Sequence, residues 1–163
     1  MDAYKAIVTK RDTRYYEPRP IPDEVLNRIL QAGRMAGSSK NTQPVRYVVV
    51  REPGMLVALA GCGSFAAHVP AAAAAIAVVL TPDGGAFDAG RAAQNMQIAA
   101  WAEGIASCPT SMHNAECARE VLGLPEGHSV SIVLALGYPD ETKPLGHGRV
   151  RLPLAELAHW ERW

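Results

Sequence analysis

Arginine and lysine side chains gather near the two ends of this 163-residue chain. Lys10–Tyr16 has the sequence KRDTRYY, and Gly148–Pro153 has the sequence GRVRLP. A third polar segment, Ser38–Pro44, reads SSKNTQP. Guanidinium groups bind phosphate bidentately, and hydroxyl and amide groups hydrogen-bond to a polyol or to the edge of a ring. Together the three segments favour a site for a phosphorylated ring cofactor, which we interpret as flavin mononucleotide (FMN).

The first and third segments also have structural interpretations. Lys10–Arg14 could be a solvated helix end, where cations balance the negative end of the helix dipole. In a phosphate site, the Asp12 carboxylate would need an arginine to pair with it. Ser38–Pro44 could be a polar loop that leaves a helix. It is nevertheless dense in fixed donors, and binding loops held on rigid elements have this composition.

Arg149 and Arg151 alternate along what we expect to be an extended strand, so both would point to one face. Two guanidinium groups on one face repel each other unless an acid or an anion lies between them. Glu156 or Glu161 could supply the acid, and a bound phosphate could supply the anion.

Other chemistries have weaker support. Cys108–His113, with Cys117 nearby, lacks the second half of a zinc site. The chain has no HExxH, GxSxG or GxxxxGK[ST] motif, and Gly61–Gly63 is too short for a dinucleotide-binding loop. We interpret His68 as a hydrogen-bonded core or boundary residue. The odd number of cysteines argues against a disulfide framework.

Composition limits the class of protein. Sixteen basic residues balance sixteen acidic ones, so no overall field attracts nucleic acid or an anionic membrane surface. The longest apolar stretch, Val69–Leu80, is too short to span a bilayer, and Met1–Lys5 does not resemble a signal peptide. We therefore expect a soluble cytoplasmic protein with one domain, residues 1–163, and no metal, membrane or nucleic-acid partner.

The pattern along the chain predicts an α+β fold rather than a doubly wound one. Pro22 with Asp23 and Glu24 is typical of the first turn of a helix. An alanine-rich stripe after Gly85 predicts a long helix that packs against another helix or a subunit. The expected helices are 2–10 (with Ile7 on the apolar side), 22–37 (with Gly37 as C-cap), 87–104, 114–123 and 154–160. The expected strands are 46–51, 72–81 (whose alanines could equally begin a helix) and 130–136.

In their order along the chain, these motifs resemble the nitroreductase family of flavin-dependent oxidoreductases. The family pattern R-R-S-x-R-x-[FY] is similar to Lys10–Tyr16, and A-P-S-S-x-N-x-Q-P-W is similar to Ala36–Val45. The matching blocks cover most of the chain. The others are Asp88–Asn95 (D-x-G-x-A-x-Q-N), Leu122–Gly127 (L-G-[LI]-P-E-G), Ala135–Pro139 (A-L-G-Y-P) and the basic segment Arg149–Glu156.

The resemblance implies a nitroreductase-like fold, with a mostly antiparallel sheet flanked by helices, and a homodimer with FMN at the interface. Arg14 would lie near the N1–C2 carbonyl edge of the flavin, whereas Arg149 and Arg151 would hold the phosphate. Ser38, Ser39 and Asn41 would reach the flavin from the partner subunit, and the Pro109–Met112 backbone would lie against the ring. The predicted cofactor-binding residues are Lys10, Arg11, Asp12, Arg14, Ser38, Ser39, Asn41, Gln43, Pro109, Thr110, Ser111, Met112, Arg149 and Arg151, and no side chain is assigned as catalytic.

The activity that the resemblance implies is FMN-dependent oxidation of NADH or NADPH, with ping-pong transfer to nitroaromatics or quinones. Asp12, Val45 and Ser111 depart from the serine, tryptophan and glutamate found in family members. A short middle region would leave the pocket open. Two alternatives therefore stand beside the reductase: a flavin-binding protein without turnover, and an enzyme that cleaves flavin to a benzimidazole, whose family branch also has an acid at the position of Asp12.

Overall fold

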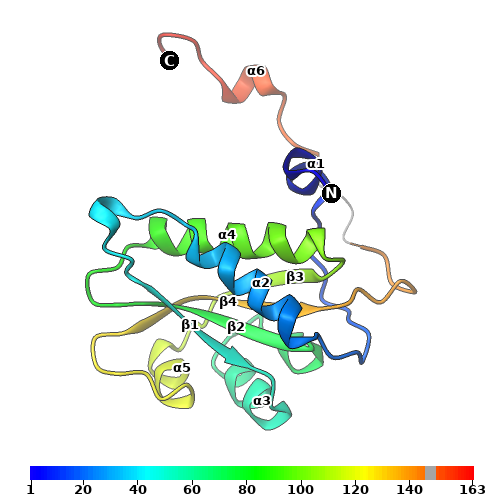
Figure 1. Ribbon diagram of the computed structural model, residues 1–163, viewed down its shortest axis with the longest axis vertical. Helices are drawn as coiled ribbons and strands as arrows, with labels where there is room; N and C mark the ends of the chain where they lie inside the picture. Colours follow the sequence, from blue (N-terminus) through cyan, green and yellow to red (C-terminus); the bar gives the residue numbers. More distant parts are fainter. Residues whose placement is uncertain (146–149) are drawn as a thin grey trace.

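The computed structural model describes residues 1–145 and 150–163, and within them four strands form one antiparallel sheet (Figure 1). The order across the sheet is β1-β2-β4-β3, and every adjacent pair runs antiparallel. This arrangement confirms the predicted α+β class. The strands are β1 (Val45–Val50), β2 (Ala74–Leu80), β3 (Ala106–Thr110) and β4 (Ser129–Gly137).

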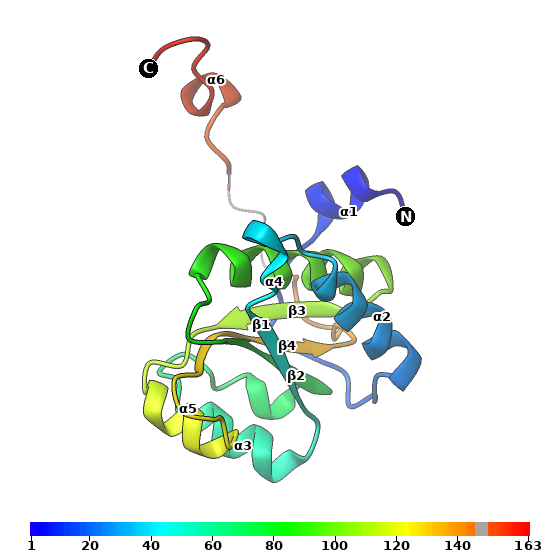
Figure 2. The same ribbon diagram turned by 60° about the vertical axis from the view of Figure 1, so that its left-hand side comes forward.

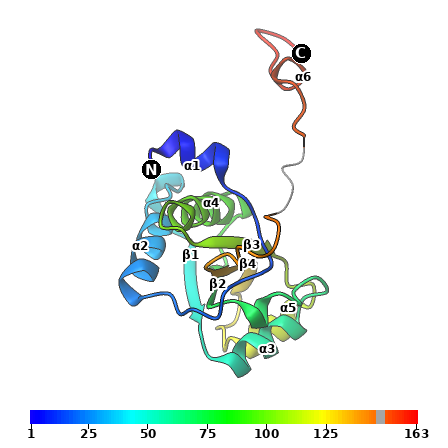
Figure 3. The same ribbon diagram turned by 90° about the vertical axis from the view of Figure 1, so that its right-hand side faces the viewer.

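Helices cover both faces of the sheet (Figures 1 and 3). One face carries α2 (Asp23–Arg34) and α4 (Ala86–Ala102), and the other carries α3 (Pro53–Gly61) and α5 (Ala115–Val121). The N-terminal helix α1 (Ala3–Thr9) lies against α4, whereas α6 (Leu154–Leu157) lies out in the C-terminal segment.

The central strand β2 divides the core into two layers. Its residues alternate between the faces, so Ile76 packs with α2 and α4, whereas Ala75 and Ala77 pack toward α3. Almost every β2 side chain is buried, because the strand has neighbours on both edges and helices on both faces. The apolar run therefore lacks the polar alternation of a half-exposed strand.

The alanine stripe of α4 packs against α2, as predicted for a helix partner. Ala89, Ala92 and Met96 are buried on this side. Close approach requires Gly33 of α2, because a Cβ there would lie 2.7 Å from Met96 Cγ. This contact holds the end of α2 against α4 and thereby positions the start of the Ser38–Pro44 loop.

Several predicted boundaries are wrong. Helix α2 ends at Arg34 with Met35 as its C-cap, so Gly37 lies beyond the helix. In α1 the buried residue is Ala6, and Ile7 is 54% exposed. Strand β1 is an edge strand in which only Val50 is buried, because its free edge has no neighbour. Helix α3 and strand β3 were not predicted from the sequence.

The C-terminal segment differs most from expectation. Residues 150–153 form no strand, and α6 is only four residues long. All of residues 150–163 are exposed, including Trp160 and Trp163, and the segment extends away from the sheet and its helices (Figures 1 and 2). Among the described helices, none combines the length and apolar character needed to cross a membrane.

Candidate functional site

The N-terminal segment lies along the edge strand β3. Asp12 and Ser107 form a parallel bridge, and the Thr13 backbone N–H donates to the Ser107 carbonyl at 3.3 Å. The Tyr16 hydroxyl donates to the Thr13 carbonyl at 2.9 Å and to the Ala135 carbonyl of β4 at 3.3 Å. These contacts bring the predicted site segments Lys10–Arg14 and Pro109–Met112 together.

The charges of the N-terminal segment have different partners. The Lys10 ammonium pairs with the Asp12 carboxylate, so the partner of this acid is a lysine and not an arginine. The Arg11 guanidinium donates to the carbonyls of Val8 and Lys10 at the end of α1, which matches the structural interpretation for this residue. Arg14 is exposed and forms no ion pair with any residue that the structure describes.

Two buried polar side chains, His68 close to this cation and Thr110 at the end of β3, each have one atom without a hydrogen-bond partner among the residues that the structure describes. His68 is 7% exposed and Thr110 is 6% exposed. The Nε2 atom of His68 and the Oγ1 atom of Thr110 accept or donate no hydrogen bond within residues 1–145 and 150–163. Buried polar groups are nearly always paired, so such atoms indicate a group that binds there. The sequence predicts a hydrogen-bonded core or boundary residue at His68, and the residue is indeed buried. The backbone groups of Cys108 and Phe65 partly offset the lowering of its pKa, although Nε2 itself has no partner in the described ranges.

The surroundings shift the titration of three side chains. Burial, reinforced by the Arg14 charge, lowers the pKa of His68. Burial raises the pKa of the Cys108 thiol, against the opposing effect of Arg14. Burial also raises the pKa of Tyr16 far above its ordinary value. At neutral pH the site therefore holds neutral buried groups beside one exposed guanidinium.

The Ser38–Pro44 loop has a strained backbone. Lys40, Asn41 and Gln43 adopt left-handed conformations with φ of 50°, 56° and 50°. The Gln43 backbone N–H donates to Ser38 Oγ at 2.8 Å, which holds the turn closed. Non-glycine residues with such angles cost about 1–3 kcal/mol each and persist at binding sites. The strain supports the binding interpretation of this loop over that of an ordinary polar loop.

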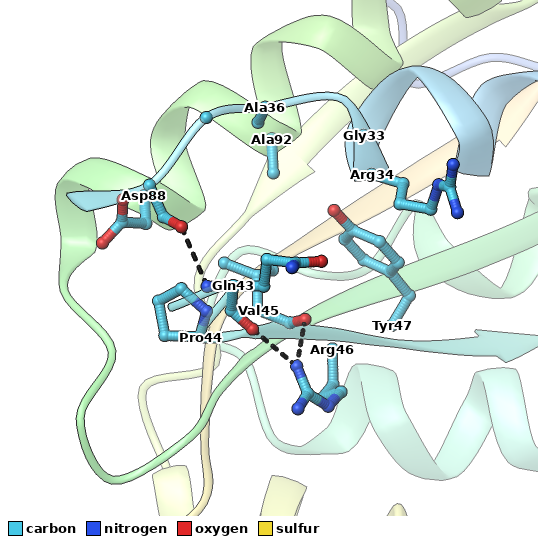
Figure 4. Close-up of a pocket in the computed structure, with 12 residues that line it drawn as sticks. Gly33, Arg34, Ala36, Gln43, Pro44, Val45, Arg46, Tyr47, Asp88 and Ala92 are labelled. Atoms are coloured by element: carbon cyan, nitrogen blue, oxygen red, sulfur yellow. Dashed lines mark hydrogen bonds between the residues drawn. The ribbon is translucent and has the colours of Figure 1, made fainter. Parts of the chain in front are cut away.

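A pocket of about 200 Å³ lies behind the loop, between α2, β1 and the first turns of α4 (Figure 4). Arg34, Gln43 and Tyr47 line it. The Arg46 guanidinium donates to the carbonyls of Gln43 at 2.7 Å and Val45 at 2.9 Å, so it fastens the loop to β1. The pocket is smaller than the roughly 300–1,000 Å³ common for ligands of drug size.

Helix α4 separates the two parts of the predicted site. Near its start, the Arg91 guanidinium donates to the Gly37 carbonyl at 2.7 Å. Near its end, Trp101 Nε1 donates to Thr9 Oγ1 at 3.0 Å. Arg91 and Trp101 are ten residues apart, which corresponds to about 15 Å along the helix axis. One copy of the chain therefore does not bring the Ser38–Gln43 loop next to Lys10–Arg14.

The structure leaves Arg151 apart from both groups. Arg151 is exposed on the extended segment, and Arg149 lies outside the described residues. Ser39, Asn41 and Ser111 are exposed as well. Met112, which follows Ser111 just after β3, is buried. No group of three His, Cys, Asp or Glu side chains in the described ranges is arranged to hold a metal ion.

The expectation against a disulfide is wrong. Cys62 and Cys117 are 55 residues apart in sequence, yet they form a disulfide because α3 and α5 pack side by side on one face of the sheet. Cys108 is the remaining cysteine, buried and unpaired. A count of cysteines cannot show which two of the three meet in the fold.

Comparisons with known proteins agree with this fold. The sequence profile of the nitroreductase family matches residues 7–80 and 60–138. An Archaeoglobus fulgidus protein that carries the provisional name NADH dehydrogenase/NAD(P)H nitroreductase is 34% identical over 173 residues, covering 99% of each chain.

Two solved structures are also similar. One is the NADPH:FMN oxidoreductase from Vibrio harveyi, solved in complex with NAD⁺. It is 29% identical in sequence, and the superposition has a TM-score of 0.89 and covers 99% of this chain and 77% of that chain. The other is a provisionally named nitroreductase from Desulfovibrio desulfuricans, solved in complex with FMN. It is 28% identical in sequence, and the superposition has a TM-score of 0.88 and covers 100% of this chain and 98% of that chain.

Proposed function

The chain belongs to the nitroreductase family, and from this premise we propose that it is an FMN-dependent NAD(P)H oxidoreductase that reduces small planar acceptors such as nitroaromatics or quinones. The observation that carries the proposal is the meeting of Lys10–Arg14 with β3. There Arg14, which has no carboxylate partner among the described residues, lies close to Cys108 and to His68, whose buried Nε2 lacks a partner in the same residues. Bound FMN would accept a hydride from NADH or NADPH and pass the electrons to the acceptor in a second half-reaction.

The donors present fit FMN. Arg14 is a cation without a carboxylate partner among the described residues, and it suits the electron-rich edge of a flavin. Thr110 Oγ1 and His68 Nε2 are neutral hydrogen-bonding atoms that suit a ring edge or a ribityl hydroxyl. Lys10 brings less net charge, because Asp12 neutralises it.

We propose that the active unit is a homodimer. The Ser38–Gln43 loop is fastened about 15 Å along α4 from the contact with Thr9, so a second copy is needed to complete the site. The exposed segment 150–163 carries Arg151 together with large apolar side chains. Burial of these side chains against a second copy would stabilise the assembly and carry Arg151 toward the cofactor phosphate.

The first experiment is anaerobic reduction of the purified protein loaded with FMN. We expect the yellow colour to bleach on addition of NADH or NADPH, and to return when a quinone or nitroaromatic is added. A protein that binds FMN but stays yellow with both donors would be a flavin-binding protein without reductase turnover, and that result would reject the proposal.

A second experiment tests the assembly. Sedimentation of the full chain is expected to give a dimer, and removal of residues 150–163 is expected to weaken both dimerisation and FMN binding. A full chain that sediments as a monomer while it binds FMN would reject the shared site. The predicted cytoplasmic location stays a prediction.

A further inference from the structure

Cys62 and Cys117 connect two segments that support the candidate site. Cys62 follows the last turn of α3 and is 2% exposed, whereas Cys117 lies in the first turn of α5 and is partly exposed. Their Cα atoms are 5.5 Å apart. The disulfide therefore joins a buried residue to a partly exposed one, so Cys117 is the side from which a small thiol would approach.

Weaker contacts join the same segments. The Asn114 backbone N–H donates to the Cys62 carbonyl at 3.0 Å, and the Ser64 backbone N–H donates to His113 Nδ1 at 3.2 Å. The rings of Phe65 and His113 meet edge to face, with centroids 5.5 Å apart. These contacts can hold the two segments near each other when the covalent bond is open.

The segment after α3 packs directly under the end of β3. A Cβ on Gly63 would lie 2.9 Å from the Ser111 carbonyl oxygen and 3.0 Å from Met112 Cε. Ser111 and Met112 belong to the stretch that we propose to lie along the flavin ring. The position of this stretch thus depends on how firmly the segment after α3 is tied to α5.

We propose that Cys62 and Cys117 form a reversible thiol–disulfide couple, whose oxidised form fixes the Ser111–Asn114 segment and thereby strengthens FMN binding. The effect on FMN rests on the function proposed above; the effect on the segment does not. The oxidant is a small-molecule disulfide such as oxidised glutathione. In compartments rich in thiols, disulfides are commonly transient or redox-sensing.

The chemistry is ordinary exchange. In the oxidising direction the Cys117 thiolate attacks the small disulfide, which releases one small thiolate and leaves a mixed disulfide on Cys117. The Cys62 thiolate then attacks the Cys117 sulfur, and the second small thiolate leaves. Overall, the two cysteines lose two electrons and two protons, and one small disulfide becomes two thiols.

The first test follows the cysteines and the backbone without reference to flavin. We expect the denatured oxidised protein to show one free thiol, that of Cys108, and the reduced protein to show three. Native-state reduction should speed hydrogen exchange in residues 110–117. The Cys62→Ser/Cys117→Ser double variant should exchange at the reduced rate with or without reductant, whereas Cys108→Ser should still respond.

The difference in exposure between Cys62 and Cys117 allows a sharper test of the couple. With oxidised glutathione, the Cys62→Ser variant should be glutathionylated at Cys117, and the Cys117→Ser variant should resist modification at the buried Cys62. Three free thiols at every glutathione ratio, or equal exchange rates in both redox states, would overturn the proposal.

The second test measures the dissociation constant of FMN in both redox states. Reduction is expected to raise it about fivefold or more, the scale of ordering one backbone residue. Equal affinities in the two states would overturn the link to the cofactor. A protein that binds no FMN in either state, yet shows the redox-dependent exchange, would reject the proposed function and leave the couple's control of the segment standing.

Discussion

The Lys10 ammonium pairs with the Asp12 carboxylate, two residues away, so the acid that departs from the family pattern neutralises the first cation of the predicted site. The Asp12→Asn substitution should free Lys10 and strengthen FMN binding about two- to fivefold, the scale of an exposed ion pair. The gain should shrink at high salt, because the Asp12 side chain of the pair is half exposed.

Titration of FMN at low and high ionic strength checks this prediction. Asp23→Asn is the matched control, since it removes an exposed carboxylate that pairs with Arg51, away from the predicted site. Weaker binding by Asp12→Asn than by the wild type would show that the carboxylate itself contacts the cofactor.

Gly63→Ala should displace the end of β3, because the new Cβ would meet the Ser111 backbone at 2.9 Å. Overpacking of this kind costs about 1–3 kcal/mol in the free energy of unfolding, and FMN binding should weaken with it. Gly61→Ala is the control, since nothing lies within 4 Å of its Cβ position. Urea unfolding and flavin titration of both variants test this prediction. Equal losses of stability and of FMN affinity in Gly63→Ala and Gly61→Ala would contradict it.

Arg151→Ala should weaken FMN binding by roughly 1.5–3 kcal/mol, tenfold or more, if the C-terminal segment delivers this guanidinium to the phosphate. Arg162→Ala removes another exposed cation from the same segment and should leave affinity nearly unchanged. Fluorescence quenching of FMN measures both, and unchanged affinity of Arg151→Ala would remove this residue from the site.

Protonation of His68 should destabilise the fold at acidic pH. Burial and the Arg14 charge lower the pKa of His68 in the folded protein, whereas in the unfolded chain it titrates near 6.5. Below that pH the unfolded chain binds a proton that the folded protein does not, so stability falls as pH decreases through about 6.5.

Urea unfolding at about pH 7.5 and 5.5 checks the sign of this effect. The His68→Gln variant should lose less stability over this interval than the wild type. His159→Gln, which changes an exposed histidine of the C-terminal segment, should behave as the wild type does. A His68→Gln variant with the wild-type pH slope would contradict the prediction.

Local patterns predicted most of the fold, and long-range contacts set what they missed. The Pro22–Glu24 start of α2, the alanine stripe of α4 and the helix expected over 114–123 follow from local chemistry, and all are confirmed. Strand β3 contains Pro109, which an edge strand tolerates because its outer N–H needs no partner. No short-range pattern indicated that edge position.

The candidate site likewise combines residues that the sequence predicts with contacts that only the fold determines. The N-terminal cations were predicted from their residue types and the Pro109–Met112 stretch from the family resemblance, whereas their adjacency depends on the Asp12–Ser107 bridge. His68 was missed because a histidine before an alanine run gives no sign of an unpartnered nitrogen. The Cys62–Cys117 bond was missed because it depends on the packing of α3 against α5.

Trp160 and Trp163 are 87% and 100% exposed, whereas Trp101 is half-buried against α1. Indole fluorescence from an isolated copy is therefore dominated by two solvated rings with red-shifted emission. If a second copy covers the C-terminal segment, as proposed above, we expect the emission to move toward the blue as protein concentration rises. The chain thus carries its own optical readout of assembly, with no added label.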